Sequence, residues 1–286
     1  MTFTLISHIT LPDETLRAAS SLYGKGNAYL KLGDHLNELL VELTPPDTEP
    51  CTIGNKTLTS SFHCAMLTVF QYVEELANRQ IVEAVRARVD LKYALHLPMN
   101  NPSLDPAALC TFRKQLFTDP ASHEIFQDLL ERLADFGLFT ATEDQPMVTA
   151  DQLLVRVCTI NRFDEIVETM HRALEAVAVS DPEWLRQITI PYWYDRYNLK
   201  RRLPSIRFTD PKWIARVLQI GADIRYLIAE IDKYSNPGLS SLPEIKEIRK
   251  IFAEQFITNS LGSDNQQQIQ WGGEKCASCR MHEYTK

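Results

Sequence analysis

Apolar side chains recur at spacings of three and four residues along most of the chain, which is the period of an amphipathic α-helix. One such series ends just before Gly137, a residue that can adopt the left-handed conformation that stops a helix. A second, longer series predicts one long helix. The two series are Ile125, Phe126, Leu129, Leu130, Leu133 and Phe136, and then Ile160, Phe163, Ile166, Val167, Met170, Leu174 and Val177.

Asp-Pro pairs mark the expected beginnings of several helices. An aspartate caps the free N–H groups of the first turn, and a proline fits that turn because no donor is needed there. The pairs are Asp105-Pro106, Asp119-Pro120, Asp181-Pro182 and Asp210-Pro211. Further helices are expected near Asp13–Leu22, Tyr29–Leu40, Lys212–Ile231 and Pro243–Phe256. The pattern therefore predicts an all-α fold.

Few segments depart from this helical pattern. Thr44–Pro50 is rich in proline, and Thr140–Pro146 is short and acidic, so both are expected to be linkers. Met147–Thr149 is the strand candidate, and it is too short for a sheet. The polar tail from Ser260 is expected to be disordered or loosely docked.

The composition is that of an ordinary soluble protein. The 286 residues are 44% hydrophobic and 23% charged, with a net charge of -7. We find neither a signal peptide nor an apolar stretch long enough to span a bilayer, so no membrane partner is expected. The six cysteines are mostly scattered singly, which is typical of reduced thiols. These observations together predict a cytoplasmic protein.

Basic residues concentrate in two places despite the acidic total. Residues 78–114 carry a net charge of +3, and residues 195–216 carry +5. A local basic face can bind DNA phosphates even when the whole chain is acidic. The first segment supplies the candidate DNA-binding residues Arg79, Arg86, Arg88, Lys92, Arg113 and Lys114.

Among these candidates Arg79, Arg86 and Arg113 are also expected to be able to approach base edges, where arginine reads guanine. The alternative is a solvated helix face whose arginines pair with Glu83 and Asp90.

Three other features have a chemical and a structural interpretation. Lys200–Arg202 is either a backbone clamp or, as we favour, a charged loop between helices. Cys276 and Cys279 with His282 have zinc-ligand spacing, but a closed site needs four ligands, so an exposed tail is favoured. For a group of aromatic residues we favour helix packing over base stacking. These are Trp184, Tyr192, Trp193, Tyr194 and Tyr197.

The stretch Leu67–Phe117, with basic side chains between apolar helical positions, resembles the N-terminal helical region of bacterial insertion-sequence DDE transposases of the InsH type. The resemblance extends in order from about Lys25 to Phe256. It rests on Lys25–Asp34, Asn78–Arg88, Asp90–Leu95, Leu109–Leu116, Leu129–Leu133, Thr159–Phe163, Tyr192–Tyr197, Gly221–Asp223 and Ile248–Phe256.

The resemblance implies a ribonuclease H-like nuclease in which three carboxylates hold two divalent metal ions such as Mg²⁺. Measured back from Asn161-Arg162, the position of the first carboxylate falls on Thr149, and Asp151 is two residues out of register. The positions of the other two would lie beyond Lys286. We therefore expect a chain truncated before the catalytic core, with no catalytic residue, metal ligand or cofactor of its own, and we leave open whether it is an enzyme.

The resemblance also predicts the domain organisation. A DNA-binding helical domain is expected over residues 1–139. Residues 140–258 are expected to be a helical segment similar to the start of the family's catalytic region and its insertion. A degenerate or disordered tail would occupy residues 259–286.

Two functions follow from these observations. The first is a non-catalytic transposase that binds double-stranded DNA at transposon ends, with itself or a full-length transposase as further partners. The second is a helical interaction module or inert remnant that binds no DNA and co-assembles with full-length transposase.

Overall fold

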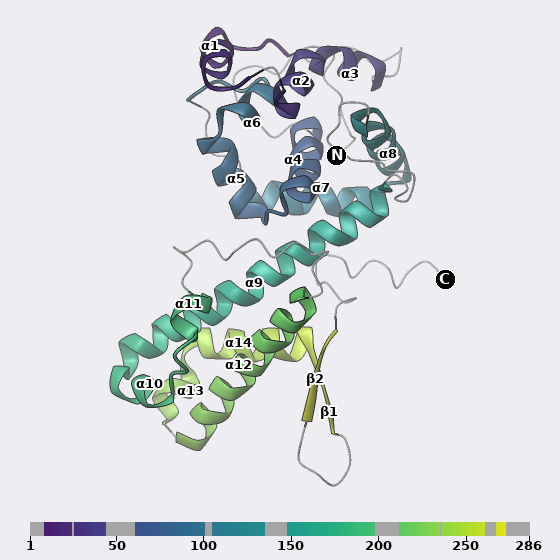
Figure 1. The fold of residues 1–286 in the computed structure, drawn as a ribbon. Helices are drawn as coiled ribbons and strands as arrows, with labels where there is room; N and C mark the ends of the chain where they lie inside the picture. The colour runs from purple at the N-terminus through teal and green to yellow at the C-terminus, as the bar shows by residue number, and fades with distance from the viewer. Residues whose placement is uncertain are drawn as a thin grey trace. The chain divides into compact units, whose positions relative to one another are not determined.

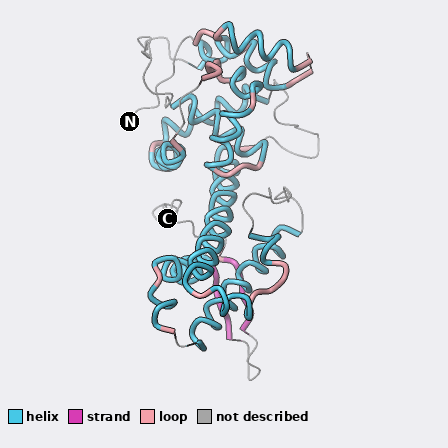
Figure 2. The backbone as a smooth tube through the Cα atoms, turned by 90° about the vertical axis from the view of Figure 1, so that its left-hand side faces the viewer, coloured by secondary structure: helices cyan, strands magenta, loops and turns pink. Residues whose placement is uncertain are grey.

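The computed structural model describes residues 9–24, 26–43, 61–100, 105–134, 148–197, 212–234, 236–260 and 267–272. These residues form fourteen helices and one antiparallel pair of short strands (Figures 1 and 2). The prediction of an all-α fold is confirmed. Within the described residues, no helix has the length and apolar character needed to cross a membrane.

The chain divides into two compact units, and the division falls between Cys158 and Thr159 inside one long helix. No finding tests the expected boundaries at residues 139 and 258, so these stay a prediction. The first unit contains α1 (Asp13–Leu22), α2 (Ala28–Asp34), α3 (Leu36–Leu43), α4 (Ser61–Glu74), α5 (Asn78–Ala87), α6 (Val89–Ala94), α7 (Pro106–Thr118), α8 (Pro120–Ala134) and the beginning of α9 (Ala150–Ser180).

The core of the first unit is built around α4. Every residue of this helix from Phe62 to Gln71 is buried, because α4 is apolar on nearly all sides and other helices cover it. Helices α5 and α7 pack against α4 and against each other (Figure 1). The region that carries most of the predicted DNA contacts is therefore built on a helix that is buried from Phe62 to Gln71.

The second unit contains the rest of α9 and a smaller set of helices around a separate core. Its elements are α10 (Pro182–Ile188), α11 (Trp193–Tyr197), α12 (Lys212–Tyr234), α13 (Pro237–Ser241), α14 (Pro243–Gln255), β1 (Phe256–Ser260) and β2 (Gln267–Trp271). Helix α12 supplies a continuous buried stripe to this core and packs against α14 and β2.

The Asp-Pro pairs act as helix starts where the structure describes them. The carboxylate of Asp105 accepts a hydrogen bond from the backbone N–H of Ala107 over 2.9 Å, and that of Asp181 accepts one from Trp184 over 3.1 Å. Each following proline occupies the first turn of its helix. Asp210 and Pro211 lie outside the described residues, and α12 is described from Lys212.

Several helices are shorter than their apolar pattern predicts. The single helix expected over Tyr29–Leu40 is divided at His35 into α2 and α3. Within the stretch Leu67–Phe117, the helical pattern is interrupted at Glu75, whose φ of 54° lies in the left-handed region, and again at Arg88. These interruptions separate α4, α5 and α6.

The strand prediction and part of the tail prediction are wrong. Val148 and Thr149 lie outside any strand and precede α9. Strands form instead at β1 and β2, which pair antiparallel. Phe256 lies opposite Trp271 at one end, and Ser260 lies opposite Gln267 at the other. Gln267–Trp271 is ordered because its backbone pairs with β1 and because the Trp271 ring packs edge-on against Trp213. The rest of the tail, residues 261–266 and 273–286, lies outside the described residues.

Candidate nucleic-acid interface

The six predicted DNA-binding residues divide into two groups by their environment. Three belong to the interior of the first unit or to ion pairs within it, namely Arg88, Lys92 and Arg113. The other three side chains are exposed on α5 and α7, and they are Arg79, Arg86 and Lys114.

Arg113 is buried in the first unit, although its sequence position indicated a DNA contact. Arg113 is 4% exposed to solvent. The guanidinium donates one hydrogen bond to Oε1 of Gln71 in α4 and one to Oδ1 of Asn78 at the start of α5, each over 3.0 Å. Arg113 therefore holds α7 against both α4 and α5.

The partners of Arg113 are neutral amides and a thiol. The amide of Asn78 also donates to Sγ of Cys110 over 3.1 Å, and the amide of Gln71 donates to Asn78 over 3.0 Å. A buried charge is tolerated only where polar groups satisfy its donors, and these amides do so. Burial raises the pKa of the nearby Cys64 thiol to about 11, and the charge of Arg113 acts in the opposite direction.

Arg88 belongs to an ion-pair network between α5 and α6. Its guanidinium lies 3.0 Å from Glu74 and 2.8 Å from Asp90, and it also lies over the ring of Tyr29. The Tyr29 hydroxyl donates to Glu74 over 2.6 Å. Arg88 therefore joins the end of α4, the start of α6 and α2, as expected for a structural arginine.

The pKa of Asp90 is lowered within this network. Burial by itself would raise the pKa, but the hydrogen bonds and charge of Arg88, together with the backbone N–H of Leu91 and the side chain of Asn27, outweigh that effect. The carboxylate is therefore held in its charged form.

Lys92 lies in α6 and is 5% exposed. Its ammonium donates to the backbone carbonyl of Met99 over 2.6 Å. Burial lowers the pKa of Lys92, the charge of Glu14 raises it, and the charge of Arg86 lowers it. The side chain thus stabilises the turn that follows α6.

The exposed group lies on two helices that pack together. Arg79 and Arg86 are seven positions apart on α5, so they share one face of that helix with Glu83 between them. Lys114 is exposed on α7, next in sequence to the buried Arg113. Within the described part of the chain, the side chains of Arg86 and Lys114 form no hydrogen bond or ion pair. They can therefore contact an external anion without losing an internal contact.

The sequence contained a signal for the burial of Arg113, which a count of basic residues along the segment does not reveal. Leu109, Phe112 and Leu116 form the apolar stripe of α7, and Arg113 falls on that same stripe. Lys114 falls on the opposite side. The position of a basic residue relative to its helix's apolar face was therefore the better criterion.

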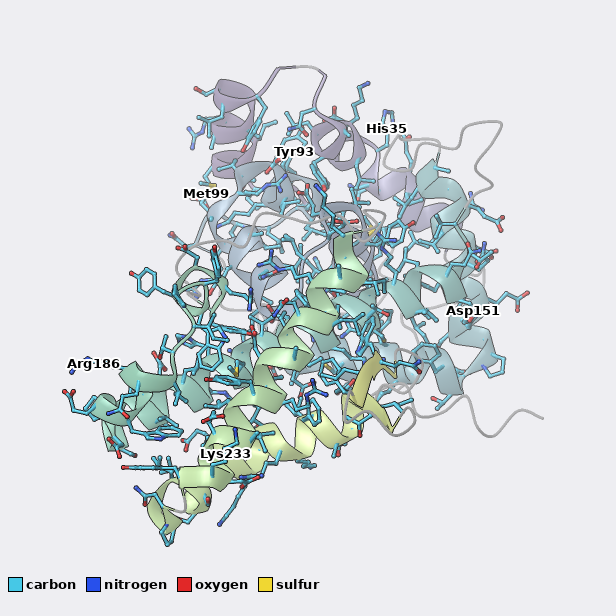
Figure 3. All side chains as sticks on the ribbon, turned by 60° about the horizontal axis from the view of Figure 1, so that its bottom comes forward. His35, Tyr93, Met99, Asp151, Arg186 and Lys233 are labelled. Atoms are coloured by element: carbon cyan, nitrogen blue, oxygen red, sulfur yellow. The ribbon has the colours of Figure 1, made fainter. Side chains whose placement is uncertain are left out.

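Thr149, the position of the first family carboxylate, has a structural role. Its hydroxyl accepts from the backbone N–H of Gln152 over 3.3 Å, and Gln152 Oε1 accepts from the Thr149 backbone N–H over 3.1 Å. This reciprocal pair is a capping box at the start of α9. Asp151, labelled in Figure 3, is exposed and pairs with His123 over 3.2 Å.

The other three features singled out in the sequence are an aromatic group, a basic run and a Cys-x-x-Cys tail, and the structure describes only the first. Trp184, Trp193 and Tyr197 are buried, in agreement with helix packing, whereas Tyr192 and Tyr194 are each 71% exposed. The basic run at residues 200–202 and the Cys-x-x-Cys tail lie outside the described residues. Among the described residues, no group of three or more His, Cys, Asp or Glu side chains is placed to hold a metal ion.

Comparison with known proteins relates part of the chain to a protein family. Residues 60–115 match the family model described as a transposase domain (DUF772). The comparison with curated proteins finds no match, and neither does the comparison with solved structures. The matched segment contains α4, α5 and α6 and nearly all of α7, which is the part of the first unit that carries the six basic residues. The match thus supports a relationship of this chain to the transposase-related family.

Proposed function

We propose that this chain is a transposase-family protein that binds double-stranded DNA at transposon ends through the exposed basic side chains of α5 and α7. The family match over residues 60–115 supports the proposal because both helices lie in it almost entirely. The finer assignment, to insertion-sequence DDE transposases of the InsH type, is part of the same proposal and rests on the resemblance of the sequence.

The observation that carries the proposal is the exposure of Arg79, Arg86 and Lys114 on two helices that pack together. Basic side chains at an exposed surface neutralise DNA phosphates and release the bound counterions. Arg88, Lys92 and Arg113 are left out of the contact set because their side chains already serve the fold.

Strand cleavage by a DDE transposase requires a cluster of carboxylates that holds divalent metal ions such as Mg²⁺. The described residues do not provide such a cluster. The proposal therefore covers DNA binding alone, and no step of strand cleavage is assigned to the described residues.

A salt series on short duplex DNA tests the proposal. The test variant is Arg86→Ala/Lys114→Ala, and the matched control is Arg186→Ala/Lys233→Ala. The control also removes one arginine and one lysine charge, from exposed positions that are both labelled in Figure 3. Arg186 pairs locally with Glu183, and Lys233 pairs locally with Glu230.

We expect the test variant to bind about tenfold more weakly near 0.1 M salt, with a salt slope reduced by about 2, because each lost phosphate contact removes about one released counterion. The control should match the parent chain. Equal binding by all three folded proteins would overturn the proposal.

The second candidate function is a helical interaction module that binds no DNA and assembles with full-length transposase. The observation that favours it is the internal use of Arg88, Lys92 and Arg113, half of the basic residues of the region. Lack of binding to any duplex at low salt by a folded, helical chain would select this candidate.

A further inference from the structure

Arg216 in α12 is a half-buried arginine. Its Nε atom is shielded from solvent and has no hydrogen-bond partner among the residues that the structure describes. Across the described residues, its guanidinium also forms no ion pair with a carboxylate. Charged groups withdrawn from water are normally paired, because desolvation of an unpaired charge is unfavourable. The unpaired guanidinium therefore indicates an anion supplied from outside the described part of the chain.

The nearest carboxylate on the same helix face is already used. Asp223 lies two turns after Arg216 and is 2% exposed. It accepts a hydrogen bond from Arg196, one from the Tyr197 hydroxyl over 2.7 Å, and one from Gln219 over 3.2 Å. The Asp223 carboxylate thus neutralises Arg196 and not Arg216, so the two arginines together keep an excess positive charge.

The electrostatics of Arg216 agree with this geometry. Burial lowers the pKa of its guanidinium, and the neighbouring charge of Arg196 lowers it further. The Tyr197 hydroxyl acts in the opposite direction. An anion bound beside Arg216 would relieve both unfavourable effects.

Exposed aromatic rings lie on the same pair of helices. Helix α11 directs Trp193 and Tyr197 into the core, while Tyr194 and the preceding Tyr192 are each 71% exposed. Tyr226 of α12 is 36% exposed and packs edge-on against Trp193. Exposed tyrosines and an arginine unpaired among the described residues, carried by neighbouring helices, match the stacking and phosphate contacts by which proteins hold single-stranded nucleic acid.

We propose that the α11–α12 surface of the second unit binds single-stranded DNA, with Arg216 contacting a phosphate and Tyr192 and Tyr194 stacking on unpaired bases. This site is distinct from the duplex-binding surface on α5 and α7, and it does not depend on that function. The ligand class follows from the described groups of the surface, which are an arginine that can contact a phosphate and exposed tyrosine rings on which bases can stack.

Binding of a fluorescent thymidine oligomer of about 15 nucleotides to the full chain tests the proposal. The variants are Arg216→Met and Tyr194→Ala, and the matched control for charge is Arg186→Met, an exposed arginine of the same unit. We expect Arg216→Met and Tyr194→Ala each to weaken oligomer binding about tenfold, and the control to leave it unchanged. Duplex binding should be unchanged in all three, which separates a failure of this proposal from a failure of the first.

Thermal unfolding provides a second readout, because the two possible roles of Arg216 predict opposite results. If Arg216 serves to bind an external anion, Arg216→Met removes no internal contact, so the unfolding temperature should stay the same or rise. If Arg216 stabilises the fold, the same substitution should lower the unfolding temperature. A lower unfolding temperature, or unchanged oligomer binding by Arg216→Met, would overturn the proposal.

Inorganic phosphate distinguishes the two sources of the same anion. If Arg216 binds a phosphate within a strand, free phosphate at equal phosphate concentration should displace the labelled oligomer much less well than unlabelled oligomer does. Equal displacement by the two competitors would assign the site to a free anion and overturn the nucleic-acid assignment.

Discussion

The guanidinium of Arg113 lies 3.0 Å from the side-chain oxygen of Asn78, and this contact joins the buried side of α7 to the first residue of α5. Arg79 and Lys114 follow these two residues directly in sequence and are exposed. The internal contact therefore holds together the two helices whose outer side chains are proposed to bind DNA. Arg113, itself buried, would thus position the surface that is proposed to bind DNA.

Replacement of Arg113 by methionine should lower the free energy of unfolding by about 3 kcal/mol, because Oε1 of Gln71 would be left buried without its donor and Asn78 would lose one of its two donors. Lys114→Met is the matched control, since it removes the neighbouring but exposed charge, and it should change stability by less than about 0.5 kcal/mol. Urea unfolding followed by circular dichroism measures both. A stable Arg113→Met protein with weakened DNA binding would instead show that Arg113 contacts DNA directly.

Local signals in the sequence were sufficient for most helices. Asp105 and Asp181 correctly predicted helix starts, because a capping aspartate and the proline after it act only on neighbouring residues. The break at Glu75 was not predictable in this way, because a glutamate gives no residue-type signal for the positive φ that it adopts. The pairing of Phe256 with Trp271 was missed for a related reason, since it joins residues that are distant along the chain.

The candidate site was predictable only in part. Composition identified the basic region, but it could not distinguish a phosphate contact from an internal ion pair. Arg88 pairs with Glu74, fourteen positions earlier, and no local spacing rule connects these two residues. Only the fold shows which basic side chains are exposed, and it reduced the candidate DNA-binding residues to Arg79, Arg86 and Lys114.

The ion pair between Arg88 and Asp90 should make the first unit sensitive to acid. The folded-state pKa of Asp90 is lowered, so the stabilisation is present above the unfolded pKa, which is near 4, and is lost as pH falls through the folded value. Asp90→Asn should therefore cost about 3 kcal/mol near pH 7 and progressively less below about pH 4. Urea unfolding at several pH values measures the difference, with the exposed Asp13→Asn as control.

His63 should produce a second pH dependence at higher pH. Burial lowers its pKa from 6.5 to about 4, opposed by the Leu95 carbonyl and assisted by the charge of His96. Because the unfolded chain takes up a proton in this window and the folded chain does not, stability should fall as pH falls from about 6.5 to about 4. The loss from this residue is at most about 3 kcal/mol.

His63→Gln is expected to flatten the pH dependence of stability in that window, because glutamine keeps a donor for the Leu95 carbonyl but does not titrate. His35→Gln replaces an exposed histidine and should leave the dependence as it is. If the two variants showed the same slope as the parent chain, another group would be responsible for the acid sensitivity.

The close approach of α2 to α6 depends on Gly33. A Cβ atom at this position would lie 2.8 Å from the backbone oxygen of Tyr93 and 2.5 Å from its ring. Backbone cannot move aside as a flexible side chain can, so Gly33→Ala should destabilise the first unit by about 2 kcal/mol or more. Gly26→Ala is the control, since a Cβ there meets nothing within 4 Å. Equal unfolding temperatures for the two variants would contradict the packing of α2 on Tyr93, the residue labelled in Figure 3.

The exposed residues of α5 and α7 should differ in the kind of DNA contact that they make. Lysine is a point charge, so Lys114→Ala should weaken binding to a transposon-end duplex and to a scrambled duplex by the same factor. The planar fork of Arg86 can read guanine, so Arg86→Ala should weaken binding to the transposon-end duplex about tenfold more than binding to the scrambled one. Titration of both duplexes at one fixed salt concentration measures the two ratios. Identical ratios for the two variants would place Arg86 on phosphate as well, and sequence choice would then have to come from another part of the chain.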